Sequence, residues 1–327
     1  MTKQNHKIKV FEGFAGYGGA SFGLRKANIP FEVIGFSEID DDAINMYSYN
    51  FPKIKNFGDI TSLDASKIPD FDLFTGGFPC QPFSTIGKRM GELDTRGTLF
   101  ADIIRICEEK KPKYILLENV RGLTVGKQKA TFLKILSELE RIGYPNPQWA
   151  LLNSKDYGIP QNRERLWIFA AYGGLPANFN IVPPKVESNL RLKDFLDKSP
   201  DPSLYRSKAQ IERIHEIRYP EPFNVTEPLC FDYYNNKIRY DGICMAVTPP
   251  EHNIMRIIEP NVNGEERFRK FSIDELFRLM GFVINDKTRE IAYPPDMSYA
   301  KLGKRAGNGW DVNLVGILLK HIFSQLS

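Results

Sequence analysis

A cysteine and a glutamate each follow an apolar run that is typical of a strand. Cys80 lies in the loop 76–84, directly after the run 71–74, and Glu118 follows the run 114–117. Two glycines allow the loop to turn sharply, and a proline on each side of the cysteine stiffens it. We therefore interpret Cys80 as a nucleophile and Glu118 as an acid delivered to the same end of one sheet.

The other three cysteines are better explained as small buried hydrophobic residues: Cys107, Cys230 and Cys244. The chain has four cysteines in all, no C-x-x-C pair and only four histidines. This composition argues against a structural zinc site and against a disulfide framework. We expect no bound metal and a reducing cytoplasmic compartment.

A glycine-rich turn, 14–19, lies between the first predicted strand and the first predicted helix. Its glycines allow the backbone to approach a ligand. Glu38, after the second strand, is placed to accept hydrogen bonds from a ribose diol, and Asp59 with Ile60 suits an adenine ring. Each acid taken alone is better explained as a surface charge or a helix cap. Together the spacing suits an adenosine, and the lack of a G-x-x-x-x-G-K-[ST] loop counts against ATP.

Strand-like and helical patterns alternate through the first half of the chain. The predicted strands are 9–11, 31–36, 72–74, 114–117 and 166–169, and the predicted helices are 20–27, 41–50, 99–110 and 129–142. This alternation predicts an α/β fold with a doubly wound, mostly parallel sheet.

The alternation ends after the glycine pair at 173–174, where prolines divide the chain into short pieces. We therefore predict a first domain over 1–175, a smaller irregular domain over 176–268, and a return segment over 269–327. The apolar stretch 313–323 should pack back onto the first domain.

Composition sets wider limits. The 327 residues carry a net charge of +4, with a pI near 8.7. This mild basic excess permits a polyanionic partner without requiring one. No apolar stretch approaches the roughly 20 residues that span a bilayer, so we expect a soluble, unprocessed protein with no membrane partner.

Five ordered motifs resemble those of the DNA (cytosine-5) methyltransferases: FAGYGG (14–19), GFPCQ (77–81), DTRGTLF (94–100), ENV (118–120) and QNRER (161–165). The resemblance covers nearly the whole chain outside the irregular region. It implies a Rossmann-like catalytic domain that binds S-adenosylmethionine, releasing S-adenosylhomocysteine, and a target-recognition domain in the irregular middle.

The resemblance also implies a cofactor pocket. By position its residues are Phe14, Ala15, Gly16, Tyr17, Gly19, Glu38, Ile39, Asp59, Ile60, Pro79, Leu99, Asn308, Gly309 and Trp310. The family more often has a small residue and then an aliphatic one after the asparagine. Gly309 and Trp310 depart from that pattern, and the effect of the tryptophan on the pocket is left open.

The implied reaction methylates carbon-5 of a cytosine. Cys80 would add to carbon-6, and Glu118, its pKa raised by burial beside apolar neighbours, would bond to ring nitrogen 3 and the exocyclic amine. Arg163 and Arg165, two positions apart on an extended segment, would anchor the base carbonyl and a phosphate. Without the cysteine and the glutamate, an ordinary pair of surface arginines would be the favoured explanation. The base must leave the duplex, and a water or hydroxide would take the carbon-5 proton.

The implied partner is double-stranded DNA. The residues expected to touch it are Gln81, Ser84, Lys88 and Arg96 in the loop after the cysteine, and Asn235, Asn236, Arg239 and Thr248 in the middle domain. A surface loop and an ordinary polar turn are the alternative explanations of these two groups.

The architecture suggests a bacterial or phage modification enzyme that acts in the cytoplasm as a monomer, with a cognate restriction endonuclease as a functional partner. Two alternatives remain: a transfer-RNA methylating branch with a shortened recognition domain, and a binding module that keeps the fold without turnover. The sequence does not reveal the recognised bases.

Overall fold

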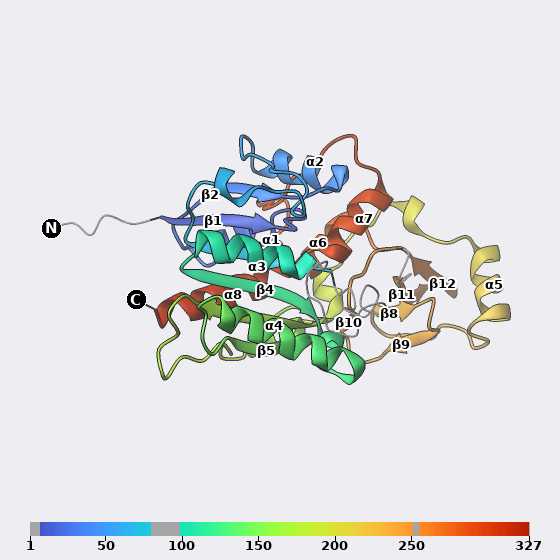
Figure 1. Cartoon of the computed structure of the whole chain (residues 1–327). Coiled ribbons are helices and arrows are strands. Elements are labelled where there is room, and N and C mark those ends of the chain that lie inside the picture. Colours follow the sequence, from blue (N-terminus) through green and yellow to red (C-terminus); the bar gives the residue numbers. More distant parts are fainter. Residues whose placement is uncertain (1–6, 80–98, 251–254, 327) are drawn as a thin grey trace, which may run out of the picture. The chain divides into compact units, whose positions relative to one another are not determined.

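The structure is a computed structural model of the 327-residue chain and describes residues 7–79, 99–250 and 255–326 (Figure 1). The chain forms two compact units, each built from separate segments. Unit 1 comprises Met1–Leu152, Glu164–Pro184 and Val315–Ser327, and unit 2 comprises Asn153–Arg163 and Lys185–Leu314.

Unit 1 is built on a six-stranded sheet with the order β2-β1-β3-β4-β7-β5. In that order the strands are Phe31–Ser37, Ile8–Gly13, Leu73–Gly77, Tyr114–Val120, Glu164–Ala171 and Gln148–Asn153. The neighbours from β2 to β4 are parallel, and β7 runs antiparallel to β4. The predicted α/β fold with a mostly parallel, Rossmann-like sheet is confirmed, although the sequence patterns did not reveal β5.

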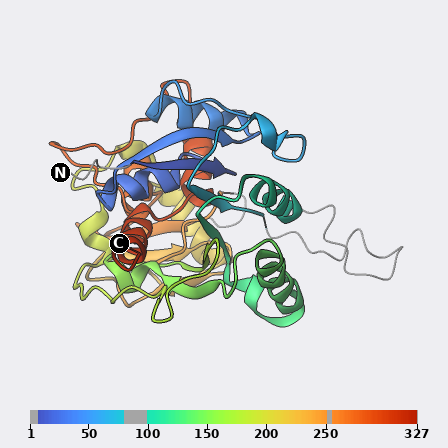
Figure 2. The ribbon, with the colours of Figure 1, turned by 60° about the vertical axis from the view of Figure 1, so that its left-hand side comes forward.

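Helices cover both faces of this sheet (Figures 1 and 2). They are α1 (Gly19–Lys26), α2 (Asp41–Asn50), α3 (Leu99–Lys110), α4 (Lys129–Arg141) and α8 (Val312–Ser324). The apolar sides of α3 and α4 share one core with alternate residues of β4, such as Ile115 and Leu117. On the opposite face the ring of Tyr114 packs edge-on against Phe323 of α8, with centroids 5.5 Å apart.

The carboxyl ends of four parallel strands meet at one edge of the sheet. Gly13 pairs with Ser37 and with the end of β3, and Gly77 pairs with Glu118. The loops that follow these strands carry the glycine-rich turn, Glu38 and the segment leading to Cys80. In an open α/β sheet this edge is where ligands bind.

Unit 2 contains a four-stranded antiparallel sheet in the order β12-β11-β8-β9. Its strands are Glu265–Arg269, Met255–Val262, Leu229–Asp232 and Lys237–Arg239. A short parallel pair, β6 (Gln161–Asn162) with β10 (Cys244–Met245), and the helices α5 (Lys208–Ile217), α6 (Ile273–Leu279) and α7 (Tyr299–Asn308) complete it. The stretch expected to be irregular is therefore partly a sheet, whose strands are too short for window-based periodicity to detect.

The two units also divide the chain differently from the predicted boundaries. Asn153–Arg163 joins unit 2, since β6 pairs with β10, and so does most of the predicted return segment. The buried guanidinium of Arg269 explains why most of the predicted return segment belongs to unit 2. It bridges Glu259 on β11, at 2.5 Å, and Glu275 on α6, at 2.8 Å. Buried charges need such partners, so the helix is bound to the sheet that precedes it.

In the part of the chain that the structure describes, no helix is both long and apolar enough to cross a membrane. The same residues contain no group of three or more His, Cys, Asp or Glu side chains arranged to hold a metal ion.

Candidate active site

Glu118 and Arg165 form an ion pair at the edge of the unit 1 sheet. Glu118 lies near the end of β4, and Arg165 lies on β7 opposite Val120. The arginine Nε is 3.1 Å from the carboxylate Oε1, and the two side chains are 18% and 13% exposed. The structure thus brings together two residues that the sequence placed in one site, and it supplies a counter-charge for the carboxylate.

Asn119 connects the strand of Glu118 to the strand that leads to Cys80. Its side-chain amide donates a hydrogen bond of 2.9 Å to the carbonyl of Phe78, and the ring of Phe78 packs against Phe100 of α3. Sequence reasoning did not assign a role to Asn119, although it lies inside the ENV motif. Its position shows that it holds the end of β3 beside that of β4.

Five predicted site residues lie outside the described residues: Cys80, Gln81, Ser84, Lys88 and Arg96. Their roles stay predictions. The described chain stops at Pro79, which is exposed, and resumes at Leu99, the first residue of α3.

Arg163 is buried and its guanidinium binds backbone carbonyl groups. The Nη atoms donate to the carbonyls of Val247 at 2.6 Å, Gly307 at 3.2 Å and Gly309 at 2.7 Å, all within unit 2. This differs from the expectation that the side chain anchors a base or phosphate beside Arg165. The expectation assumed a continuous strand, in which residues two apart share a face. Instead the chain turns between β6 and β7, where the Arg163 amide donates to the Gln161 carbonyl.

The glycine-rich turn is fastened to the loop after β2. Phe14 and Gly16 have φ angles of 53° and 55°, in the left-handed region that a phenylalanine rarely adopts. The Ala15 amide donates to the carbonyl of Ser37 at 3.3 Å, and the Gly16 amide donates to the Glu38 carboxylate at 2.9 Å. The strained turn is therefore held in place by its neighbouring strand.

The Glu38 carboxylate accepts two further backbone hydrogen bonds, from Ile39 at 2.9 Å and Asp40 at 3.0 Å. Asn56 fixes the Glu38 backbone from the other side, through contacts at 3.1 and 3.3 Å. Next to this carboxylate, the Ile39 side chain is 70% exposed, which is unusual for a large aliphatic residue. A rigid acid beside an exposed apolar side chain suits a ligand with a hydroxylated, partly apolar structure.

The remaining predicted cofactor residues differ in exposure. Asp59 is exposed and its carboxylate accepts the amide of Thr61 at 2.9 Å, whereas Ile60 is buried. Ala15, Tyr17 and Gly19 are also buried. In unit 2, Asn308 is exposed, while Gly309 and Trp310 are buried.

Glu12 is a buried acid beneath the turn that the sequence analysis missed. Its carboxyl is 2% exposed and accepts hydrogen bonds from Ser21 and from Tyr47, the latter at 2.9 Å. Burial raises its pKa from 4.5 to about 7, although both hydrogen bonds favour the charged form. The sequence signal that could have revealed Glu12 is an acidic residue within the apolar strand before the glycine-rich turn.

Three of the four predicted DNA-contacting residues of unit 2 have hydrogen-bond or ion-pair partners within the protein. Asn235 binds Asp232 with its backbone and side-chain amides at 2.9 and 2.7 Å, and Arg239 forms an ion pair with Asp241. Asn236 donates to the Arg218 carbonyl. The Thr248 hydroxyl is buried and has no hydrogen-bond partner among the described residues.

The chain matches the C-5 cytosine-specific DNA methylase family over residues 8–324. This chain belongs to that family. The match supports DNA cytosine-5-methyltransferase activity and the methyltransferase identity that the five motifs predicted.

Two relatives of this methylase are similar over most of their length. The type II methyltransferase M2.ScrFI of Lactococcus lactis subsp. cremoris is 35% identical, over 97% of this chain and 99% of the relative. The type II methyltransferase M.NlaX of Neisseria lactamica is 34% identical, over 84% of this chain and 85% of the relative.

The fold of the methylase is also similar to a solved structure, that of the S. pombe Dnmt2 methyltransferase. The TM-score is 0.71 over 98% of this chain and 100% of that one, at 21% sequence identity. A likeness at this identity supports the fold.

Proposed function

We propose that this protein transfers a methyl group from S-adenosylmethionine to carbon-5 of a cytosine in a short duplex DNA sequence, through a covalent adduct between Cys80 and carbon-6. The observation that carries the proposal is the Glu118 and Arg165 pair. It lies at the strand ends, next to the strand that leads directly to the cysteine. A thiol and a supported acid at one edge are what activation of a cytosine ring requires.

The proposed chemistry begins at the cysteine. The Cys80 thiolate forms a bond to carbon-6, and the displaced π electrons make carbon-5 nucleophilic. Glu118 would bond to ring nitrogen 3 and the exocyclic amine, where the negative charge collects. Arg165 would hold the carboxylate in this orientation and offer its remaining donors to the base carbonyl. After methylation, loss of the carbon-5 proton to water or hydroxide lets the carbon–sulfur bond break and restores the thiolate.

The residues of the turn fit the proposed cofactor. The Glu38 carboxylate, held by three backbone amides, can still accept hydrogen bonds from a ribose diol, and exposed Ile39 can pack on an adenine ring. A Cβ added at Gly16 would meet no atom within 4 Å, so the space beside the turn is open to a ligand. When bound, S-adenosylmethionine supplies an activated methyl group and leaves as S-adenosylhomocysteine. Asn308, Gly309 and Trp310 of unit 2 are proposed as cofactor residues from the resemblance of their sequence alone.

The target cytosine is proposed to leave the duplex, because its carbon-6 face is covered inside the base stack. Residues of the loop after Cys80 would close over it, as their polar character in the sequence suggests. Thr248, a partly exposed residue, would touch the DNA backbone. Arg163 would act as a positioning residue that holds the backbone near this threonine.

The wider setting is also proposed. A bacterial or phage enzyme, acting in the cytoplasm as a monomer with a restriction endonuclease as its functional counterpart, agrees with the bacterial type II relatives. Sedimentation of the protein on a duplex site would test the monomer.

The direct test incubates the purified protein with S-adenosylmethionine and mixed-sequence duplex DNA, and maps 5-methylcytosine by bisulfite sequencing. Methylation confined to one short motif would support the proposal and reveal the recognised bases. Modification of RNA in place of DNA, measured with transfer-RNA substrates, would overturn the assigned substrate.

Two variants test the assigned roles. Cys80→Ser should abolish methylation while it retains DNA and cofactor binding, and a variant that still transfers methyl groups would refute the nucleophile. Glu118→Ala should slow turnover about 10²–10⁴-fold, the usual range for a general acid or base. Intact turnover with a lower affinity for the cofactor would show that Glu118 serves binding instead.

A further inference from the structure

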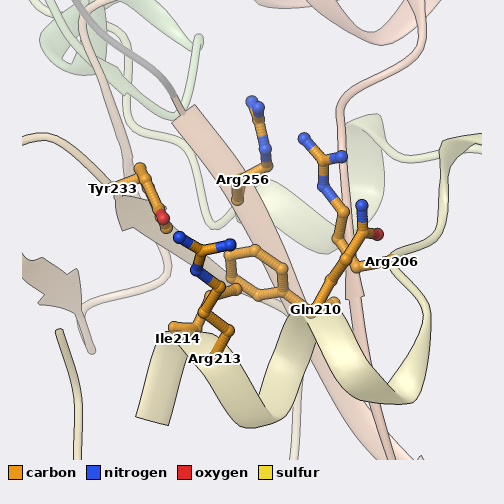
Figure 3. Close-up of a pocket in the computed structure, with 7 residues that line it drawn as sticks. Arg206, Gln210, Arg213, Ile214, Tyr233 and Arg256 are labelled. Atoms are coloured by element: carbon orange, nitrogen blue, oxygen red, sulfur yellow. The ribbon is translucent and has the colours of Figure 1, made fainter. Parts of the chain in front are cut away.

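Unit 2 contains a cavity of about 370 Å³ lined by positively charged side chains (Figure 3). Arg206, Gln210, Arg213 and Ile214 come from α5 and the residues just before it, Tyr233 comes from the turn after β8, and Arg256 comes from β11. None of these residues belongs to the cofactor site or to the expected DNA-contacting residues of this unit.

The cavity has an apolar floor and a rigid frame. Ile214 of α5 packs in one buried cluster with Phe268 of β12. The amide of Arg206 donates a hydrogen bond of 2.8 Å to the Phe268 carbonyl, so the residue before α5 is fastened to the sheet. Figure 3 shows the guanidinium groups of Arg206 and Arg256 and the amide of Gln210 projecting to the same side.

Three arginines line this cavity: Arg206, Arg213 and Arg256. Among the residues that the structure describes, Arg206, Arg213 and Arg256 form no ion pair with a carboxylate. Elsewhere in unit 2, Arg267 lies 3.0 Å from Glu259 and Arg289 lies 2.6 Å from Asp274. The cavity therefore concentrates positive charge that the described residues around it leave without an ion-pair partner.

Two pKa shifts agree with this geometry. Burial, and then the charge of Arg206, lowers the pKa of Arg256 to about 10. Burial, followed by the charges of Arg206 and Arg256, also lowers the pKa of Lys270. Like charges held together in a half-buried site repel one another, and a bound anion would relieve that repulsion.

The number and kind of donors favour a phosphate over a base. A guanidinium presents parallel N–H groups that match two phosphate oxygens, and one arginine is enough to bind the edge of a guanine. Several clustered arginines without a carboxylate are matched by a charged ligand, whereas a neutral base edge would leave the repulsion in place. A water molecule occupies about 30 Å³ of liquid, so the cavity has room for a phosphodiester with its sugar.

We propose that this cavity binds a backbone phosphate of the DNA substrate through Arg206, Arg213 and Arg256. The inference rests on the proposed action on duplex DNA and identifies a phosphate contact in unit 2. Phosphate contacts fix the position of a protein on the duplex, and bases are read by other groups. The arginines would therefore set affinity and register without choosing the sequence.

The test measures binding to a labelled duplex by fluorescence anisotropy from 50 to 200 mM KCl, using the full-length protein. Loss of one phosphate contact should lower the slope of log affinity against log salt by about 0.9. We expect Arg256→Gln and exposed Arg213→Gln to show this change, with affinity at 50 mM KCl roughly threefold to tenfold weaker, and Arg256→Lys to keep most of the wild-type slope. Arg289→Gln removes the same charge from a paired arginine and is the matched control.

Bisulfite mapping of the same variants distinguishes a failure of the phosphate site from a failure of the proposed function. A methylated motif that is unchanged, together with a lower salt slope, would support the phosphate site. A wild-type slope of log affinity against log salt in both glutamine variants would overturn the phosphate site. An altered base preference at one position of the methylated motif would also overturn it, because it would indicate base reading. If the wild-type protein methylated no DNA but its salt slope still depended on these arginines, the anion site would stand and the proposed function would fail.

Discussion

Arg163 and Arg165 are two positions apart and have different surroundings. Arg165 faces the acid at the sheet edge, with its guanidinium 3.1 Å from Glu118. Arg163 is buried and donates to three backbone carbonyl groups. Arg165 therefore lies at the proposed active site, whereas Arg163 ties together backbone segments of unit 2.

This difference predicts that substitution by lysine should lower mainly stability at Arg163 and mainly catalytic activity at Arg165. Arg163→Lys replaces two separate Nη donors with a single Nζ, which should lose at least one of the three carbonyl contacts, so the free energy of unfolding should fall by about 2–4 kcal/mol. Arg165→Lys keeps the charge at a partly exposed pair and should change stability by about 1 kcal/mol or less, while it lowers kcat. Urea unfolding and methylation rates measured on both variants check this. Similar stability losses would contradict the division of roles.

Glu12 predicts a dependence of stability on pH. The folded state holds a proton on this carboxyl up to about pH 7, whereas the unfolded chain releases it near pH 4.5. Between these values the folded state binds more protons, so the free energy of unfolding falls as pH rises, by about 3 kcal/mol in total. Glu12→Gln should remove this part of the fall. Urea unfolding at pH 5, 6, 7 and 8 measures it, and equal slopes in both proteins would refute the assignment.

At the scale of elements, the end of α7 lies very close to the backbone of Thr248 and Pro249. A Cβ at Gly307 would be 2.2 Å from the Pro249 nitrogen and 2.3 Å from the Thr248 carbonyl carbon. Neither backbone atom can move aside as a flexible side chain would. The absence of a side chain at Gly307 thus permits a close approach that also brings its carbonyl to Arg163.

Two glycines of α7 provide a matched comparison. Gly307→Ala should lower the free energy of unfolding by about 3 kcal/mol or more, because overpacking against the backbone forces the helix to shift. At Gly303 the added Cβ would be 3.5 Å from Pro250, an ordinary contact. Gly303→Ala should be neutral or stabilise by up to about 1 kcal/mol through helix propensity. Urea unfolding of the two variants decides the point, and equal tolerance of both would contradict the close approach.

At the scale of the whole molecule, unit 1 depends on the last helix of the chain. Val315, Leu318, Leu319 and Ile322 of α8 are fully buried. Each such side chain contributes about 1.5–3 kcal/mol by leaving water, so together they approach the total stability of a typical domain. A single segment from the far end of the sequence is therefore essential to the first unit.

A truncation tests this dependence. A chain that ends at Leu314 should lose cooperative thermal unfolding and bind a dye specific for exposed apolar surface, because the face of the sheet around Tyr114 is uncovered. A chain that ends at Gln325 keeps α8 and serves as the control. Cooperative unfolding of the shorter chain, near the wild-type Tm, would show that α8 is dispensable.

The sequence by itself determined the local parts of this protein. The ends of β1, β2, β3 and β4 were readable because each apolar run stops at a glycine or an acid, and parallel strands bring such ends to one edge. The positions of the glycine-rich turn, Glu38 and Glu118 followed from this. The order of five motifs indicated the family, because motifs are contiguous in the chain.

Only the tertiary structure decided which residues become neighbours. The turn between β6 and β7 separates Arg163 from Arg165, the pairing of β6 with β10 assigns Asn153–Arg163 to unit 2, and the packing of α5 on its sheet gathers Arg206, Arg213 and Arg256. Hydrogen bonds, charge repulsion and burial act through space between residues far apart in the chain, whereas sequence patterns report only on positions a few residues apart. The strand-end positions of Glu38 and Glu118 could therefore be predicted from the sequence, but their hydrogen-bond and ion-pair partners could not.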